Sequence, residues 1–134
     1  MDTTEIRETE GETLTRLPEA ELEAMLAVWR CEPPVTTARV MLLVDPKRSW
    51  KTPTLISFLT RLEKRGFLTA EKHGREYVWI PAVDRDRYLT FLTRDFLARV
   101  HGGSLPAFLS ALAGEDPLPG DLIDGLLRWL ESRS

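Results

Sequence analysis

The sequence predicts a mostly α-helical protein that contains one small β-hairpin. Apolar residues recur at spacings of three and four in several segments, a period typical of helices that bury one face. After Gly66 the period changes to alternation, which favours paired strands. Prolines and glycines separate these segments at the places where helices are expected to begin or end. The 134 residues suffice for one small domain with a helical extension.

Three helices are expected in the first half of the chain. The first covers about residues 18–30, where a proline and two glutamates suit the first turn. The second covers about 36–44, with a threonine hydroxyl as its N-cap. The third, over 52–65, is the clearest, because Thr52 can cap it and Pro53 suits the first helical position. Together they predict a three-helix module.

A hairpin and further helices are expected after the third helix. Residues 67–80 alternate around a basic turn at 72–75, as in two antiparallel strands. Apolar residues then recur at helical spacing over about 84–101, 105–112 and 119–132. We therefore predict three helices behind the hairpin.

The chain is expected to divide into three parts: a flexible acidic tail over 1–16, a compact module over 17–82 and a helical dimerisation region over 83–134. The last part carries more apolar residues than so short a segment can bury in itself, so a second copy is the expected partner. The candidate dimerisation residues are Tyr88, Leu92, Phe96, Val100, Leu122, Leu126, Trp129 and Leu130.

The charge is unevenly distributed along the chain. The formal net charge is −3, yet residues 47–76 carry eight basic side chains against three acidic ones. Residues 1–24 carry the opposite excess, with eight acids against two bases. A polyanion responds to charge within a Debye length of about 8–10 Å. The basic middle of the chain is therefore the candidate surface for nucleic acid.

Three helices followed by a hairpin with a basic turn is the order of a winged helix-turn-helix, in which the third helix enters the major groove of DNA. Hydroxyl groups and cations on that helix can meet base edges and phosphates, and cations at the hairpin turn can meet the backbone. The candidate DNA-binding residues are Lys51, Thr52, Thr54, Ser57, Arg61, Lys64, Lys72, His73 and Arg75. A solvated polar face gives a similar pattern, so a winged-helix adapter that binds another protein is the alternative.

The sequence also resembles the penicillinase-repressor (BlaI/MecI-like) family of winged-helix transcriptional regulators. The first segment that carries the resemblance is 17–25 with the following Val28-Trp29. The most specific is 50–68, which matches the family's recognition helix nearly position by position. The resemblance continues through 74–81 and, more weakly, 96–105, and it covers about residues 17–132 in all.

The resemblance implies a homodimeric repressor that binds a two-fold-symmetric operator in double-stranded DNA. It also implies a membrane sensor-protease as a further partner, which releases the repressor by cleaving it near its C-terminal helices. Where those relatives have an Asn-Phe bond, this sequence has Ser110-Ala111. Metal-sensing relatives carry a cysteine cluster near the C-terminus, whereas Cys31 is the only cysteine here, so no metal site is expected.

An enzyme is not expected. His73 and His101 have no metal-ligand spacing around them, and Cys31 follows an apolar stripe that favours packing over catalysis. The sequence has no glycine-rich phosphate loop, so no cofactor is predicted. It also has no apolar run of membrane-spanning length and no secretory signal, so a cytoplasmic protein without membrane insertion is expected.

Overall fold

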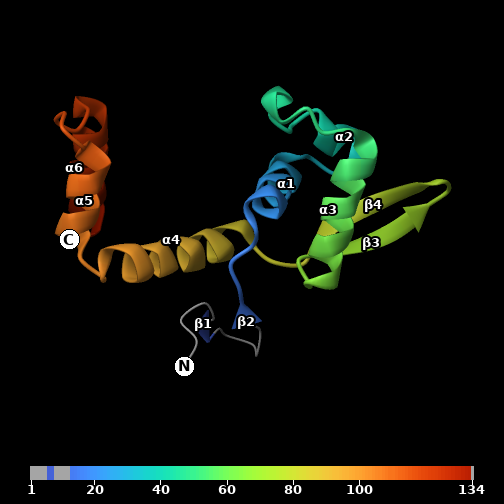
Figure 1. Cartoon of the computed structure of the whole chain (residues 1–134), viewed down its shortest axis with the longest axis horizontal. Coiled ribbons are helices and arrows are strands. Elements are labelled where there is room, and N and C mark those ends of the chain that lie inside the picture. The colour runs from blue at the N-terminus through green and yellow to red at the C-terminus, as the bar shows by residue number, and fades with distance from the viewer. Residues whose placement is uncertain (1–5, 8–12, 134) are drawn as a thin grey trace. The chain divides into compact units, whose positions relative to one another are not determined.

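A computed structural model describes residues 6–7 and 13–133, and the chain forms two compact units, residues 1–92 and 93–134. The first unit contains β1 (Ile6–Arg7), β2 (Thr13–Leu14), α1 (Glu19–Arg30), α2 (Thr37–Met41), the 3₁₀ turn η2 (Pro46–Arg48), α3 (Thr52–Lys64), β3 (Leu68–His73) and β4 (Glu76–Pro81) (Figure 1). Helix α4 (Arg85–His101) begins in the first unit and ends in the second, which also holds α5 (Leu105–Ala113) and α6 (Gly120–Arg133). The predicted class, mostly helical with a small hairpin, is confirmed.

The core of the first unit lies where α1 and α3 pack together. Helix α1 contributes Met25 and Val28, and α3 contributes three leucines spaced four and three residues apart, all essentially inaccessible to solvent. This spacing places the leucines on one side of α3, so the opposite side faces solvent. The buried apolar residues are Leu14, Leu17, Ala24, Met25, Ala27, Val28, Cys31, Val35, Val40, Leu55, Leu59, Leu62, Phe67, Leu68, Trp79, Val83, Tyr88 and Phe91.

The connection from α2 to α3 differs from the prediction. Helix α2 ends at Met41, because the next three backbone N–H groups donate to carbonyls three residues back, at 2.9–3.4 Å, rather than four. These tighter turns lead into η2, which the sequence pattern did not indicate. Helix α3 begins one residue earlier than expected, with Lys51 in the N-cap position and Thr52 already helical. The first helical residue of α3 is therefore Thr52.

The hairpin is attached to the start of α2. Strands β3 and β4 are antiparallel, with His73 opposite Glu76, and Gly74 has the positive φ (66°) that a two-residue hairpin loop needs at its first central position. On β4, the backbone N–H of Trp79 donates to the carbonyl of Val35 at 2.8 Å, and its indole N–H donates to the Thr37 hydroxyl at 3.0 Å. These two bonds hold the hairpin beside the helices.

Part of the segment predicted as a flexible tail is ordered by packing. The side chain of Leu14 is buried, and the Tyr88 hydroxyl accepts the Leu17 N–H at 2.8 Å and donates to the Thr15 carbonyl at 2.9 Å. Residues 14 and 15 therefore differ from that prediction, because Leu14 joins the core and a buried tyrosine on α4 supplies a hydrogen-bond partner for the Thr15 carbonyl. Residues 1–5 and 8–12 of the predicted tail lie outside the described residues.

The second unit is a small group of helices that leaves most of its apolar surface uncovered. The glycine pair 102–103 ends α4 with two positive φ angles, and the Ser104 hydroxyl caps α5 by accepting the Ala107 N–H at 3.1 Å. The ring of His101 lies edge-on between the rings of Phe96 and Phe108. No residue of α5 or α6 is fully buried. Among the described residues, no helix is both long and apolar enough to cross a membrane.

Candidate nucleic-acid interface

The solvent side of α3 carries most of the predicted DNA-binding residues. Thr54, Ser57, Arg61 and Lys64 are spaced three, four and three residues apart, so they lie along one side of the helix, and all are exposed. Lys51 and Thr52 are exposed at its N-terminal end. The buried leucines on the opposite side anchor the helix, and this leaves hydroxyl groups and cations free to meet a ligand surface.

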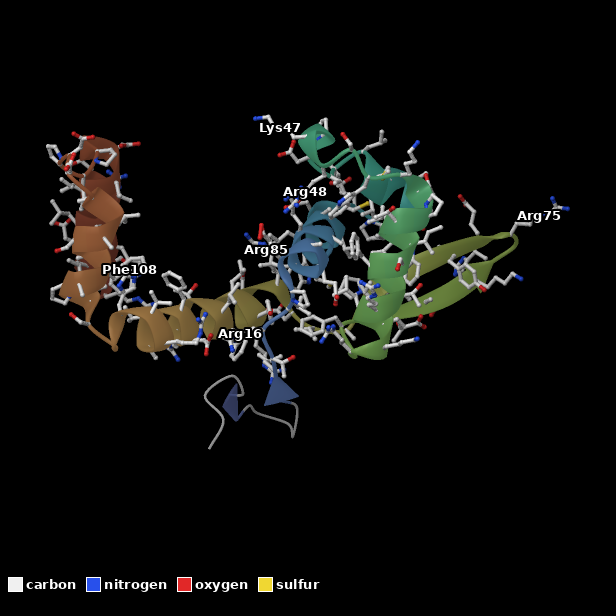
Figure 2. All side chains as sticks on the ribbon, in the orientation of Figure 1. Arg16, Lys47, Arg48, Arg75, Arg85 and Phe108 are labelled. Atoms are coloured by element: carbon white, nitrogen blue, oxygen red, sulfur yellow. The ribbon has the colours of Figure 1, made fainter. Side chains whose placement is uncertain are left out.

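The hairpin carries the remaining predicted residues. Lys72 and His73 are at the end of β3, Arg75 is in the loop, and all three are exposed. Figure 2 shows Arg75 at the tip, pointing away from the body of the unit. The imidazole Nε2 of His73 lies 3.2 Å from Glu71 Oε1. The hairpin and α3 are neighbouring elements in the first unit (Figure 1), and each of them presents exposed cations.

Aromatic rings support the side chain of Arg61. Its guanidinium lies 5.8 Å from the centre of the Phe58 ring, and the Phe58 ring lies 4.9 Å from that of Trp50. The guanidinium of Arg48 lies 5.7 Å from the centre of the Trp50 ring. A cation over an aromatic face is attracted by the ring quadrupole. Trp50 is half-buried, packs against the core and supports the Phe58 ring.

Two arginines of the basic segment form ion pairs with acidic residues of α1, although their side chains are partly exposed. The Arg48 Nε atom lies 2.8 Å from both carboxylate oxygens of Glu23, and Arg48 Nη2 lies 3.4 Å from Glu19. The hydrogen bond to Glu23 raises the pKa of Arg48 above its usual value, with further support from the charges of both glutamates. Arg65 donates to Glu21 at 2.6 Å, and that carboxylate is almost completely buried. Sequence composition alone could not reveal these pairs, because they join residues far apart in the chain.

The predicted dimerisation residues fall into two groups. Tyr88 is fully buried in the core of the first unit, and Leu92 is half-buried against that core. The other six are between 42% and 52% exposed. These six are Phe96, Val100, Leu122, Leu126, Trp129 and Leu130.

The fold and the placement of these groups define the class of the first unit. A helical core presents one polar helix face, and an antiparallel hairpin with a cationic tip is fixed beside it, which is the arrangement of a winged helix-turn-helix.

Comparisons with known proteins agree with this class. The model of the penicillinase repressor family matches residues 17–132. The chain belongs to this family. It is 30% identical to the penicillinase repressor of Bacillus licheniformis over 118 residues, which span 88% of this chain and 91% of that one. It is 28% identical over 108 residues to an uncharacterised 16.5 kDa protein from the ptsI 3′ region of Latilactobacillus sakei, with coverage of 81% and 73%.

A solved structure of a relative is also similar. It is the solution structure of the monomeric form of Bacillus licheniformis BlaI in complex with the blaP half-operator. The match is 32% identical, has a TM-score of 0.45, and covers 55% of this chain and 88% of that one.

Proposed function

We propose that this chain is a cytoplasmic transcriptional repressor that binds a two-fold-symmetric operator in double-stranded DNA as a homodimer. The observation that carries the proposal is the exposed polar face of α3 together with the hairpin that packs beside this helix and carries cations at its tip. The family relationship supports the same role, since the Bacillus licheniformis relative is a penicillinase repressor.

The two elements are expected to contact different parts of the duplex. Thr54, Ser57 and Arg61 lie on a helix whose exposed side can enter the major groove and meet base edges. Lys72 and Arg75 lie on a narrow two-stranded element that can approach the sugar–phosphate backbone. Base edges then determine sequence preference, and phosphate contacts determine position.

The second unit supports the proposal of a homodimer. In α6, five large apolar side chains are between 41% and 53% exposed, in addition to Leu122 at 45%. These five are Ile123, Leu126, Leu127, Trp129 and Leu130. An amphipathic helix is stable only when its apolar side is covered, and a second copy with two-fold symmetry covers both chains at once. A two-fold dimer would present two α3 helices to successive major grooves.

The Arg75→Ala substitution should weaken binding to every duplex by a similar factor. A contact with a phosphate displaces counterions, so its loss should reduce the slope of log affinity against log salt by about one unit for each protomer. Fluorescence anisotropy with labelled duplex over a salt series measures this slope. Arg85→Ala is the matched control, because Arg85 lies on α4 and pairs with Asp86 at 3.0 Å, so its loss should leave the slope unchanged.

The Arg61→Ala substitution should act differently in the same assay. If this guanidinium reads a base edge, its loss costs about 1–3 kcal/mol on the operator and much less on unrelated duplex. A salt slope and an affinity that are unaffected in both the Arg75 and Arg61 variants would contradict DNA binding through the hairpin and α3. That outcome would favour an adapter that binds another protein.

We also propose that regulated proteolysis of the C-terminal region, by a membrane sensor-protease, releases the repressor. The bond between Ser110 and Ala111 lies inside α5, where both residues are exposed but helical. A protease needs an extended substrate, so cleavage there requires α5 to unwind locally. Mass spectrometry of the chain recovered from induced cells should show fragments that end within 105–113. Induction without any cleavage in the C-terminal region would contradict this route.

A further inference from the structure

One large apolar side chain on α3 takes no part in the core. Ile56 is 42% exposed, whereas the three leucines of the helix are completely buried and Phe58 packs against the core. Of its neighbours one turn away, Pro53 is exposed and Thr60 is half-buried. Packing within the chain therefore does not explain an isoleucine at this position. The sequence already indicates that Ile56 is exposed, because this residue falls outside the spacing of the apolar residues that face the core.

Ile56 lies in the part of α3 that suits contact with base edges. The exposed side chains of the first half of the helix are uncharged hydroxyl or apolar groups, while Arg61 and Lys64 follow in the second half. In helix-turn-helix proteins, the N-terminal residues of the recognition helix contact base edges. An uncharged surface that includes Ile56 is suited to base edges more than to phosphates.

We propose that Ile56 is a specificity-determining residue that packs on the C5-methyl group of a thymine in the major groove. This inference rests on the proposed function. The thymine methyl is the apolar group that base pairs present in that groove, and the other base edges present hydrogen-bond donors and acceptors. An isoleucine placed on those polar edges would remove their water and supply no hydrogen bond in return. Each operator half-site should therefore hold a thymine opposite the second turn of α3.

Uracil substitution tests this contact, because uracil differs from thymine only by the missing methyl group. The operator is first selected from random duplex with the full-length protein, and each thymine is then replaced by uracil in turn. Loss of one buried methyl-sized contact should lower the affinity roughly three- to fivefold at one thymine in each half-site. Fluorescence anisotropy with the native and substituted duplexes gives the profile.

The Ile56→Ala variant identifies the side chain responsible. It should bind the operator more weakly and lose its sensitivity to uracil at that one position, while it keeps any sensitivity at the others. Ile80→Ala is the matched control, since Ile80 on β4 is also an exposed isoleucine, at 36%, and should keep the wild-type profile. Thermal unfolding of both variants checks that they fold.

Two results would overturn the proposal. The first is an Ile56→Ala variant with the same uracil profile as the wild type, and the second is a selected half-site without thymine. Failure of the full-length protein to bind any duplex at low ionic strength is a different result, because it would overturn the proposed function itself.

Discussion

The Leu126→Asp variant is expected to be monomeric and to bind the operator about 100- to 10,000-fold more weakly than the wild type. Leu126 is 42% exposed on the apolar side of α6. A carboxylate there would lose its hydration when a second copy covers it, so the substitution opposes association. Each α3 would then bind its half-site alone, without the high effective concentration that the dimer provides. Light scattering gives the oligomeric state, and anisotropy gives the affinity.

Arg128→Asp is the control for this prediction. It places the same new carboxylate on α6, at an exposed position that is already charged. This variant should remain dimeric and keep an affinity within a few-fold of the wild type. A Leu126→Asp protein that is still dimeric would show that α6 does not join the two copies. A monomer that binds as tightly as the dimer would show that dimerisation adds nothing to the affinity for the operator.

The Leu59→Ala substitution should lower the free energy of unfolding by about 2–5 kcal/mol. Leu59 is completely inaccessible to solvent in the core beneath α3. Truncation removes buried methyl groups and leaves a cavity that the surrounding side chains fill only in part. The measurement is urea unfolding followed by circular dichroism, at one fixed protein concentration because association adds to apparent stability.

Thr54→Ala is the companion variant on the opposite side of the same helix. Thr54 is exposed, so its truncation should change the free energy of unfolding by no more than about 0.5 kcal/mol. It should nevertheless weaken binding to the operator, because the hydroxyl lies on the proposed groove face. Equal stabilities for the two variants would mean that α3 is not anchored through Leu59.

The sequence was sufficient to predict the helices, the hairpin and the polar face of α3. Their signals are local, namely the spacing of apolar residues, a proline near the start of a helix and a glycine at a turn. Contacts between distant segments gave no such signal. The apolar side of α4 is an example. The spacing of its apolar residues indicates that Tyr88 is buried, but it does not indicate that Tyr88 packs in the core of the first unit or that its hydroxyl donates a hydrogen bond to the Thr15 carbonyl.

The same limitation applied to charge. Counting basic residues over 47–76 treats all of them as equivalent, whereas the structure directs Arg48 and Arg65 to carboxylates of α1. Residues that are exposed and uncharged, such as Ile56, add nothing to such a count. The composition could therefore indicate a candidate interface on α3 and the hairpin, but it could not distinguish the cations that face outward from those that hold the helices together.

The pairing of Arg48 and Arg65 with glutamates has a consequence for the search along a chromosome. Random genomic sequence outnumbers any operator by many orders of magnitude, and it attracts a protein through charge alone. Two guanidinium groups that are already neutralised within the molecule contribute little to this background attraction. In the proposed mode of binding, the molecule would thereby be less readily retained on irrelevant sites, and a larger share of its discrimination would come from the groups on α3 that are proposed to meet the bases.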